Sequence, residues 1–271
     1  MKVLYSFLFF CCFSSLAMAG NLTISNKLSV IINFDSVICK IQVTNLGSES
    51  ACDVFVKLFI FNNRYKSKTI PILEVHDTAN FQFSVPLPVI AKGSYLAVVE
   101  TFYDDITLSP NSSLTCHVFY VREAIQPNIT VKVNDFVMLD DGDIVVSIKN
   151  NEKIEKKIKA SVFAPIDFKV EPHSVIKQIP ENSQEIILFN IERQKVGKEY
   201  QIAYYSAVEY DILDHHYTTL SKGHIKAKET DNWFRKNKWY WIIGFWMWIG
   251  LWCLCDFVHR YFCTKNCNRH H

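Results

Sequence analysis

The residues of this sequence most capable of chemistry lie in one short polar stretch. Imidazole nitrogens and carboxylate oxygens within a few positions of one another can bind a divalent metal ion. No fixed ligand spacing is present, however, and polar loop tips commonly carry such residues. We therefore predict a solvated binding loop without a metal, made of Asp211, Asp214, His215 and His216.

The familiar motifs of catalysis do not occur in the sequence. There is no nucleophile elbow, phosphate-binding loop or zinc-protease motif. The net charge is only +2 and no long basic run occurs, so nothing indicates nucleic-acid binding. We predict a protein that is not an enzyme and that uses no cofactor.

The 9 cysteines leave few thiols for a disulfide outside the cell. Cys39 and Cys116 each alternate with apolar residues along an expected strand, so both can point into one core. We predict a Cys39–Cys116 disulfide, with Cys52 as a spare thiol. The alternative is that all three thiols are free and partly buried.

A membrane anchor is the element that positions the rest of the chain. From Trp239 to Cys255 no residue is charged, and such a stretch, at about 1.5 Å per residue, nearly spans a hydrocarbon core of about 30 Å. All 6 tryptophans lie between Trp233 and Trp252, and indole rings favour the lipid headgroup boundary. We predict a transmembrane helix over residues 239–258, preceded by a juxtamembrane segment, 231–238.

One stripe of this expected helix is aromatic. Its residues follow one another at spacings of four and three, so the stripe can pack on a partner helix, with lipid contact as the alternative. An acidic residue near the inner end costs free energy unless it reaches water or a partner. The predicted contacts for a partner helix are Trp241, Phe245, Trp248, Trp252 and Asp256.

The expected cytoplasmic tail, residues 259–271, is too short to form a signalling domain. Cysteines beside a membrane helix are common palmitoylation sites, and four occur in or below the helix. The predicted palmitoylation sites are Cys253, Cys255, Cys263 and Cys267. The alternative is a zinc site made of Cys263, Cys267, His270 and His271.

Residues 1–19 match a secretory signal peptide. Lys2 precedes a short apolar run, and Ala17-Met18-Ala19 supplies small residues at the cleavage site. An uncleaved first membrane helix is the alternative. A signal peptide followed by one membrane helix gives type I topology, with residues 20–238 outside the cytoplasm. We expect the protein at the cell surface, in a secretory-pathway membrane, or in a virion or host membrane if it is viral.

Three sequons for N-glycosylation occur at expected loops or strand edges, where a sugar would not disturb a core. They fall in the first half of the expected ectodomain or at its boundary, so a bare binding face is expected on the second half. The predicted glycosylation sites are Asn21, Asn111 and Asn128.

The sequence pattern of the expected ectodomain is typical of short β-strands. Apolar and polar residues alternate with period two, and turn-forming residues separate the alternating stretches. The expected strands are 37–44, 54–58, 81–85, 95–103 and 114–121 in the first half, and 144–149, 158–163 and 186–189 in the second.

The second half of this region repeats the first. The strand that ends before Asn150 matches the strand before Asn45, and residues 197–212 match residues 93–106. The offset between matching residues stays between 104 and 106 positions, which is too long for a solenoid repeat. We infer duplicated domains with a boundary near residues 123–128.

About seven strands per 100 residues, with turns between them, are typical of an immunoglobulin-like or fibronectin-like β-sandwich. The expected sandwiches contain no tryptophan, so only the architecture is inferred and not the antibody pattern of cysteines and tryptophan. We predict two tandem sandwiches, over residues 20–125 and 126–230, followed by the transmembrane helix.

These expectations favour a single-pass type I membrane glycoprotein whose ectodomain binds another protein, as adhesion proteins, receptors and viral envelope or accessory proteins do. The loop that holds Asp211 is the one that immunoglobulin-like domains commonly use for recognition. The alternative is an obligate non-catalytic subunit of a membrane complex, held by its helix. A metal-dependent enzyme built on the polar loop is a third hypothesis.

Overall fold

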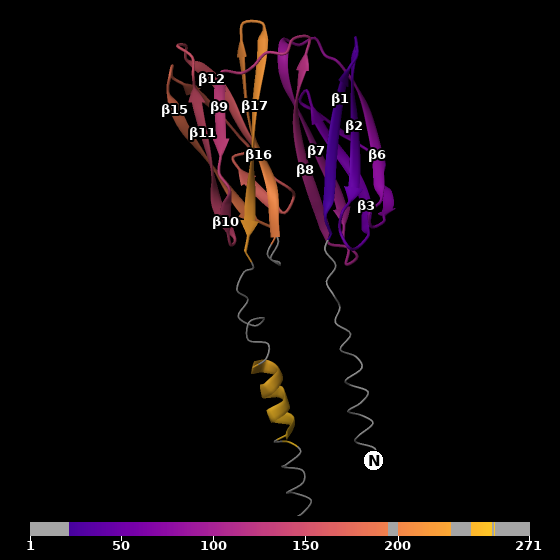
Figure 1. The fold of residues 1–271 in the computed structure, drawn as a ribbon. Helices are drawn as coiled ribbons and strands as arrows, with labels where there is room; N and C mark the ends of the chain where they lie inside the picture. Colours follow the sequence, from indigo (N-terminus) through magenta and orange to yellow (C-terminus); the bar gives the residue numbers. More distant parts are fainter. Residues whose placement is uncertain (1–21, 195–199, 229–239, 251, 253–271) are drawn as a thin grey trace, which may run out of the picture. The chain divides into compact units, whose positions relative to one another are not determined.

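The computed structural model describes residues 22–194, 200–228, 240–250 and 252, in two units, of which one ends at Lys228 and the other begins at Glu229. The described part of the first unit is all-β (Figure 1). Its strands are β1 (Ile24–Ile32), β2 (Ser36–Asn45), β3 (Ala51–Ile60), β4 (Asn63–Lys66), β5 (Ile70–Leu73), β6 (Thr78–Pro86), β7 (Lys92–Asp104), β8 (Pro110–Val121), β9 (Ile129–Val133), β10 (Phe136–Met138), β11 (Asp141–Asn150), β12 (Lys156–Phe163), β13 (Phe168–Glu171), β14 (Ser174–Ile179), β15 (Gln184–Arg193), β16 (Tyr200–Ile212) and β17 (His215–Ala227).

The first β-sandwich comprises β1 to β8. A three-stranded sheet with the order β1-β2-β6 packs against strands that include β3, β7 and β8. Because successive side chains of a strand lie on opposite faces, alternate residues such as Ile41, Val56 and Val99 meet in one buried core.

The second β-sandwich comprises β9 to β17. A four-stranded sheet with the order β13-β15-β11-β9 packs against β14, β12, β16 and β17. Its core includes Ile144, Phe189 and Tyr204, which are fully buried. The Tyr204 hydroxyl donates a hydrogen bond to the carbonyl of Asn134 at 2.8 Å, so this buried polar group is satisfied.

Each sandwich contains a similar polar turn, at equivalent positions of the internal sequence repeat. Asn45 and Asn150 are both fully buried at the ends of β2 and β11. The Asn45 amide donates to the carbonyls of Glu49 at 2.8 Å and Leu73 at 3.1 Å. The Asn150 amide likewise donates to the carbonyl of Ile154 at 2.8 Å and to two carbonyls at the end of β14. The same hydrogen-bonded corner in both halves agrees with the repeat seen in the sequence.

All eight strands expected from the alternating pattern lie within observed strands: 37–44 in β2, 54–58 in β3, 81–85 in β6, 95–103 in β7, 114–121 in β8, 144–149 in β11, 158–163 in β12 and 186–189 in β15. The all-β fold of sandwich type is therefore confirmed. Strands that the pattern did not identify include β1, the short β4 and β5, and β17, whose polar sequence hides its alternation.

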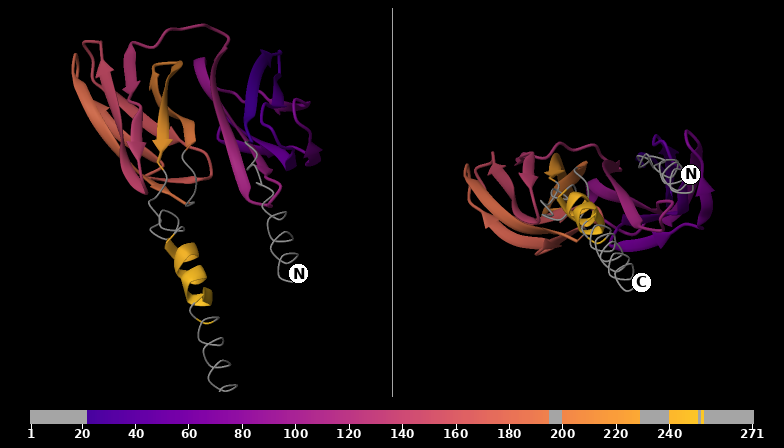
Figure 2. Two further views of the ribbon diagram at one scale, coloured as in Figure 1. Left: turned by 60° about the horizontal axis from the view of Figure 1, so that its bottom comes forward. Right: turned by 90° about the horizontal axis from the view of Figure 1, so that it is seen from below.

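The two sandwiches are joined by their neighbouring sheets. β17 pairs in parallel with the start of β7, where His215 lies opposite Lys92 and His216 opposite Gly93, so one sheet of ten strands runs through both halves (Figure 2). A third buried cluster lies at this joint and combines residues of the first sandwich with residues of the second: Leu96, Val98, Leu114 and Cys116 with Tyr205 and Ala207. We call this set the interface core.

The predicted Cys39–Cys116 disulfide is wrong in this structure, where Cys39, Cys52 and Cys116 are free. Cys39 lies in the core of the first sandwich, whereas Cys116 lies on the opposite face of its sheet, in the interface core. β8 is buried on both faces, since Phe119 and Val121 point into the first core. Burial raises the pKa of the Cys39 thiol to about 11 and also raises that of Cys116, which keeps both thiols protonated and unreactive. The alternative of free buried thiols agrees with the structure.

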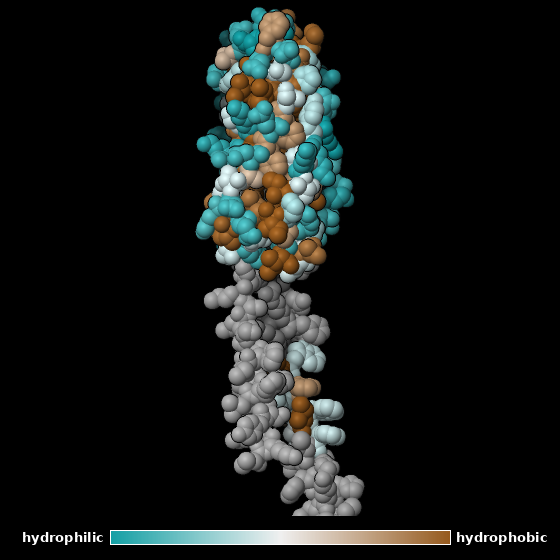
Figure 3. All heavy atoms as spheres, turned by 90° about the vertical axis from the view of Figure 1, so that its right-hand side faces the viewer, coloured by the Kyte–Doolittle hydropathy of each residue, from teal (hydrophilic) through white to brown (hydrophobic). Residues whose placement is uncertain are grey.

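The outer surface of the first sandwich is mixed in character. Figure 3 shows hydrophobic residues interspersed with hydrophilic ones on one side of the molecule. Large hydrophobic side chains exposed by this sandwich include Phe34, Ile72 and Val89. Scattered apolar side chains are normal at a protein surface, so they define no binding site.

The described part of the second unit is helical over residues 240–250 and at 252. Within the described residues, no helix reaches the length and hydropathy needed to cross a bilayer. The predicted span, 239–258, lies partly outside the described residues, as do the signal peptide, 1–19, the juxtamembrane segment, 231–238, and the tail, 259–271.

Candidate binding cleft

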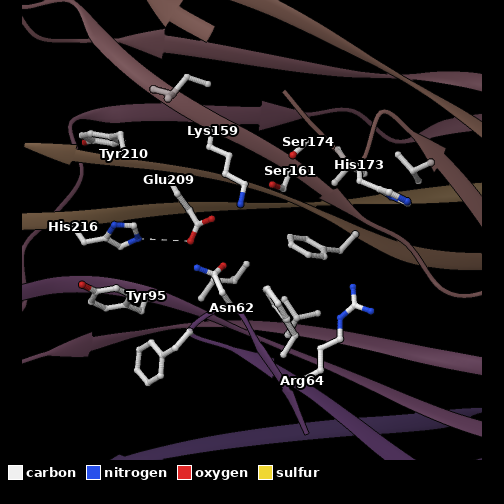
Figure 4. A pocket seen from close by; sticks show the side chains of 18 of the residues that line it. Asn62, Arg64, Tyr95, Lys159, Ser161, His173, Ser174, Glu209, Tyr210 and His216 are labelled. Atoms are coloured by element: carbon white, nitrogen blue, oxygen red, sulfur yellow. Dashed lines mark ion pairs between the residues drawn. The ribbon is translucent and has the colours of Figure 1, made fainter. Parts of the chain in front are cut away.

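A cleft of about 1070 Å³ lies between the two sandwiches (Figure 4). Residues of β3 and β4 line it from the first sandwich and residues of β12 and β14 from the second, with further residues from β7, β8, β16 and β17. The cleft lies beside the interface core, to which β7 and β8 of the first sandwich and β16 of the second contribute buried residues. Its size is that of a binding site for a ligand or for a segment of a partner.

Part of the cleft lining is apolar and continuous with the interface core. Leu96, Val98 and Leu114 belong to both, and Phe59 and Phe163 pack against that core and line the cleft as well. An apolar lining can stabilise a bound partner by removing its apolar surface from water, at about 25 cal/mol per Å².

Several cationic side chains surround this apolar lining. Arg64 comes from β4, and Lys157 and Lys159 come from β12 on the other side (Figure 4 labels Arg64 and Lys159). All three side chains are exposed, and no ion pair ties them within the described part of the chain. Lys57 also lines the cleft, but its ammonium lies 4.1 Å from the centre of the Phe102 ring, in a cation–π contact.

Glu100 is a half-buried acid at the joint between the sandwiches. Its carboxylate accepts a hydrogen bond from the Ser112 hydroxyl at 2.8 Å, and the backbone N–H of Ile166, in the second sandwich, donates to the same hydroxyl at 2.8 Å. Burial raises the pKa of Glu100, and the Ser112 hydrogen bond and the charge of Lys57 partly oppose that change. Glu100 is thus engaged in holding the two sandwiches together.

His216 is the second polar group at the joint. Its ring stacks on Tyr95 of the first sandwich, with centroids 4.4 Å apart. Its Nδ1 lies 2.7 Å from an oxygen of Asp211, and its Nε2 lies 3.6 Å from an oxygen of Glu209, the contact drawn dashed in Figure 4. The imidazole therefore lies between two carboxylates and an aromatic ring.

The surroundings of His216 change its acidity in opposing directions. Burial lowers the pKa of the imidazole, but the hydrogen bonds and charges of Glu209 and Asp211 outweigh that effect, so the net pKa is raised. Burial and the charge of Asp211 also raise the pKa of the Tyr95 hydroxyl to about 12, and this hydroxyl donates to the carbonyl of Ala91 at 2.8 Å.

The predicted binding loop is not a free loop tip in the structure. The β16–β17 hairpin closes in a tight turn at Leu213 and Asp214, and the backbone N–H of Lys92 donates to the Asp214 carbonyl at 3.2 Å. His215 lies 2.8 Å from an oxygen of Asp214 and 3.6 Å from one of Glu123. Of the four predicted residues, Asp211 and His216 line the cleft.

The structure also shows whether histidine and carboxylate side chains are grouped as ligands of a metal ion. Across the described ranges, no group of three or more histidine, cysteine, aspartate or glutamate residues is arranged to hold a metal ion. His216 and its two carboxylates instead satisfy one another.

Two of the three predicted glycosylation sites fall within the described residues. Asn128 is exposed, and its amide donates to a carboxylate oxygen of Glu152 at 3.1 Å. Asn111 is half-buried at the start of β8, and its amide donates to the carbonyl of Ser109 at 2.8 Å. Asn21 lies outside the described residues, as do Cys253, Cys255, Asp256, Cys263 and Cys267.

The aromatic residues of the predicted helix stripe are all exposed in the second unit. The exposed fractions are 56% for Trp241, 60% for Phe245, 67% for Trp248 and 69% for Trp252. Neighbours outside the stripe, such as Tyr240 and Met247, are equally exposed, so exposure does not single out one face of this helix.

Sequence reasoning missed most of the cleft. Arg64 lies in the four-residue β4, and Lys157 and Lys159 alternate with buried residues of β12, as solvent-facing lysines commonly do. Beside the predicted Asp211 and His216, the outward-facing apolar residues Leu96 and Val98 carried a signal, because β7 is apolar on both faces and must therefore be covered twice.

The comparisons with known proteins give information mainly about the fold. The model of the CARDB family matches residues 20–106. A comparison with curated proteins found no significant match.

Solved structures that the chain resembles are distant from it. Red sea bream transglutaminase is 11% identical with a TM-score of 0.27, over 78% of this chain and 32% of that one, so this chain spans about a third of that enzyme's length. An Escherichia coli α-2-macroglobulin is 8% identical with a TM-score of 0.30, over 76% of this chain and 22% of that one. The PapD-like domain 7 of human CEP192 is 11% identical with a TM-score of 0.28, over 41% of this chain and 94% of that domain. Likenesses at this level carry no argument about activity. The described part of the first unit is thus an all-β fold of sandwich type, and residues 20–106 are similar to a CARDB domain.

Proposed function

We propose that this protein is a single-pass type I membrane glycoprotein whose two sandwiches bind another protein in the cleft between them. The observation that carries the proposal is the cleft itself, which combines a partly buried apolar lining with exposed cations that form no ion pair within the described residues, at the joint between two sandwiches. Rigid elements that hold a concave surface in place are typical of recognition modules.

The exposed side chains of the second unit support the membrane part of the proposal. Tyr240, Ile243, Phe245 and Trp248 are each more than half exposed to solvent along the helix. An apolar helix without a covering partner is unfavourable in water and favourable in a bilayer. The uncharged stretch continues in the sequence to Cys255, beyond the described helix.

The experiment that tests the proposal captures partners with the full chain from its native membrane in mild detergent. Ile176, which lines the cleft and is 64% exposed, is replaced by tryptophan to fill the cleft. The matched control is Ile186→Trp, because Ile186 is 55% exposed on β15 of the opposite sheet.

We expect Ile176→Trp to reduce the recovered partner at least about tenfold, the equivalent of roughly 1.4 kcal/mol, and Ile186→Trp to leave recovery unchanged. Equal recovery with both variants would remove the cleft as the binding site.

The second candidate is an obligate non-catalytic subunit of a membrane complex, and the aromatic exposure of the helix favours it. Replacing residues 239–258 with an unrelated membrane helix separates the two functions. A surface binder keeps its partner after the exchange, whereas a subunit held through its helix loses the assembly.

A further inference from the structure

We infer that the cleft takes an extended acidic segment of a partner polypeptide, with carboxylates beside Arg64, Lys157 and Lys159 and apolar side chains against the half-buried Phe59 and Phe163 at the edge of the interface core. This inference rests on the proposed function and names the chemistry of the partner.

The charges of the cleft divide into an engaged set and a free set. Glu209 and Asp211 both face His216, and Glu100 is hydrogen-bonded to Ser112. Arg64, Lys157 and Lys159 are exposed and form no ion pair within the residues described. The unmatched charge that a ligand meets is therefore positive, although Glu209 lies opposite Lys159 in the strand pairing.

The cations lie on both sides of the cleft. A single small anion does not contact the cations of both sides at once. Arg64 lies opposite Phe59 in the β3–β4 hairpin of the first sandwich. Lys159 lies opposite Ile176 in the β12–β14 pair of the second. A ligand that satisfies both sides carries at least two acidic groups separated by apolar ones, as an acidic polypeptide segment does.

The edges of the ten-stranded sheet favour a polypeptide over other anionic ligands. β14 and β4 are the two terminal strands of its path, and both contribute cleft residues. A terminal strand has backbone N–H and C=O groups without a strand partner on one side, and a polypeptide backbone can pair with them.

A direct binding measurement tests the inference. The full chain in mild detergent is titrated into a fluorescein-labelled peptide of about eight residues that alternates glutamate and valine, and polarisation reports binding. A lysine–valine peptide of the same length tests the sign of the charge. Vesicles of phosphatidylcholine and phosphatidylserine test a lipid surface as the anionic ligand.

The variants separate the cleft from general electrostatics. The double variant Arg64→Glu with Lys159→Glu reverses one charge on each side of the cleft. Both side chains are exposed, so we expect the fold to be retained. The matched control is Lys40→Glu with Lys132→Glu, because these exposed lysines lie on β2 and β9, outside the cleft.

We expect saturable binding of the glutamate peptide, weakened at least about tenfold by the cleft double variant and weakened in high salt, with little change in the control. No saturable binding, equal binding of the lysine peptide, or binding of vesicles alone overturns the inference. If the cleft double variant recovers the native partner normally while Ile176→Trp does not, the acidic segment is wrong and the proposed function still holds.

Discussion

At the scale of single residues, His216 connects the cleft to the joint between the sandwiches. The ring is held by Asp211 and Glu209 of β16 and by Tyr95 of β7, and Gly93 pairs with its backbone. A protonated imidazole between two carboxylates strengthens each of these ionic contacts. Both carboxylates belong to the second sandwich, as His216 does, so the contact through which the charge of this ring reaches the first sandwich is its stacking on Tyr95, which protonation turns into a cation–π contact.

The raised pKa of His216 predicts a pH dependence of stability. Because the folded-state pKa lies above the unfolded value, the stabilising contribution is fully present below the unfolded pKa and is lost as pH rises through the folded pKa. We expect the thermal midpoint of the wild-type chain to exceed that of His216→Gln more at about pH 5.5 than at about pH 8.5.

The matched control for this prediction is His224→Gln. The His224 ring also lies beside a carboxylate, 3.3 Å from Asp135, but within the second sandwich alone. If the difference in thermal midpoint between the wild-type chain and His216→Gln does not vary with pH, the imidazole contributes only packing at the joint.

At the scale of elements, the contact between β7 and β17 depends on a residue without a side chain. Gly93 adopts a φ of +126°, and a Cβ there would lie 1.9 Å from the carbonyl oxygen of His216. The close approach and the backbone conformation both require glycine. The pairing that joins the sandwiches thus depends on this one position.

We predict that Gly93→Ala separates β7 from β17 and lowers the free energy of unfolding by about 2 kcal/mol or more. Denaturant unfolding gives the change, and limited proteolysis near residues 122–128 tests whether the two sandwiches come apart. The control is Gly142→Ala, where the nearest atom to a Cβ is a Phe136 side-chain carbon at 3.3 Å. Unchanged stability in Gly93→Ala would show that the interface core alone holds the joint.

At the scale of the whole molecule, the chain combines a pair of sandwiches with an apolar helix. The first unit buries many apolar side chains in three cores and exposes scattered others, such as Phe34 and Val89, whereas the described helix of the second unit leaves its large apolar side chains exposed. The proposed membrane anchor would place these side chains in lipid, which replaces a protein core around a spanning helix.

We predict that the full chain stays in the membrane pellet after alkaline carbonate extraction. Trp246→Asp with Met247→Asp should release it, because each aspartate at the centre of a span costs about 2.5 to 3.5 kcal/mol. Leucine at the same two positions is the control and should leave the protein in the pellet. Release of the wild-type chain by carbonate would contradict the membrane anchor.

The sequence by itself determined eight of the strands, the internal sequence repeat and the apolar C-terminal stretch, because each depends on local alternation, spacing or composition. The period-two pattern of β2, β3 and β11 and the repeated Asn45 and Asn150 all follow from the order of residues.

Only the tertiary structure decided which faces of the strands meet. β7, β8 and β16 are buried on both sides, so the alternation of Cys116 with Leu114 indicated burial but not in which core, and the predicted disulfide failed for that reason. The cleft has the same origin. Arg64 and Lys159 are far apart in the chain, and the packing of one sandwich against the other places them around one cavity.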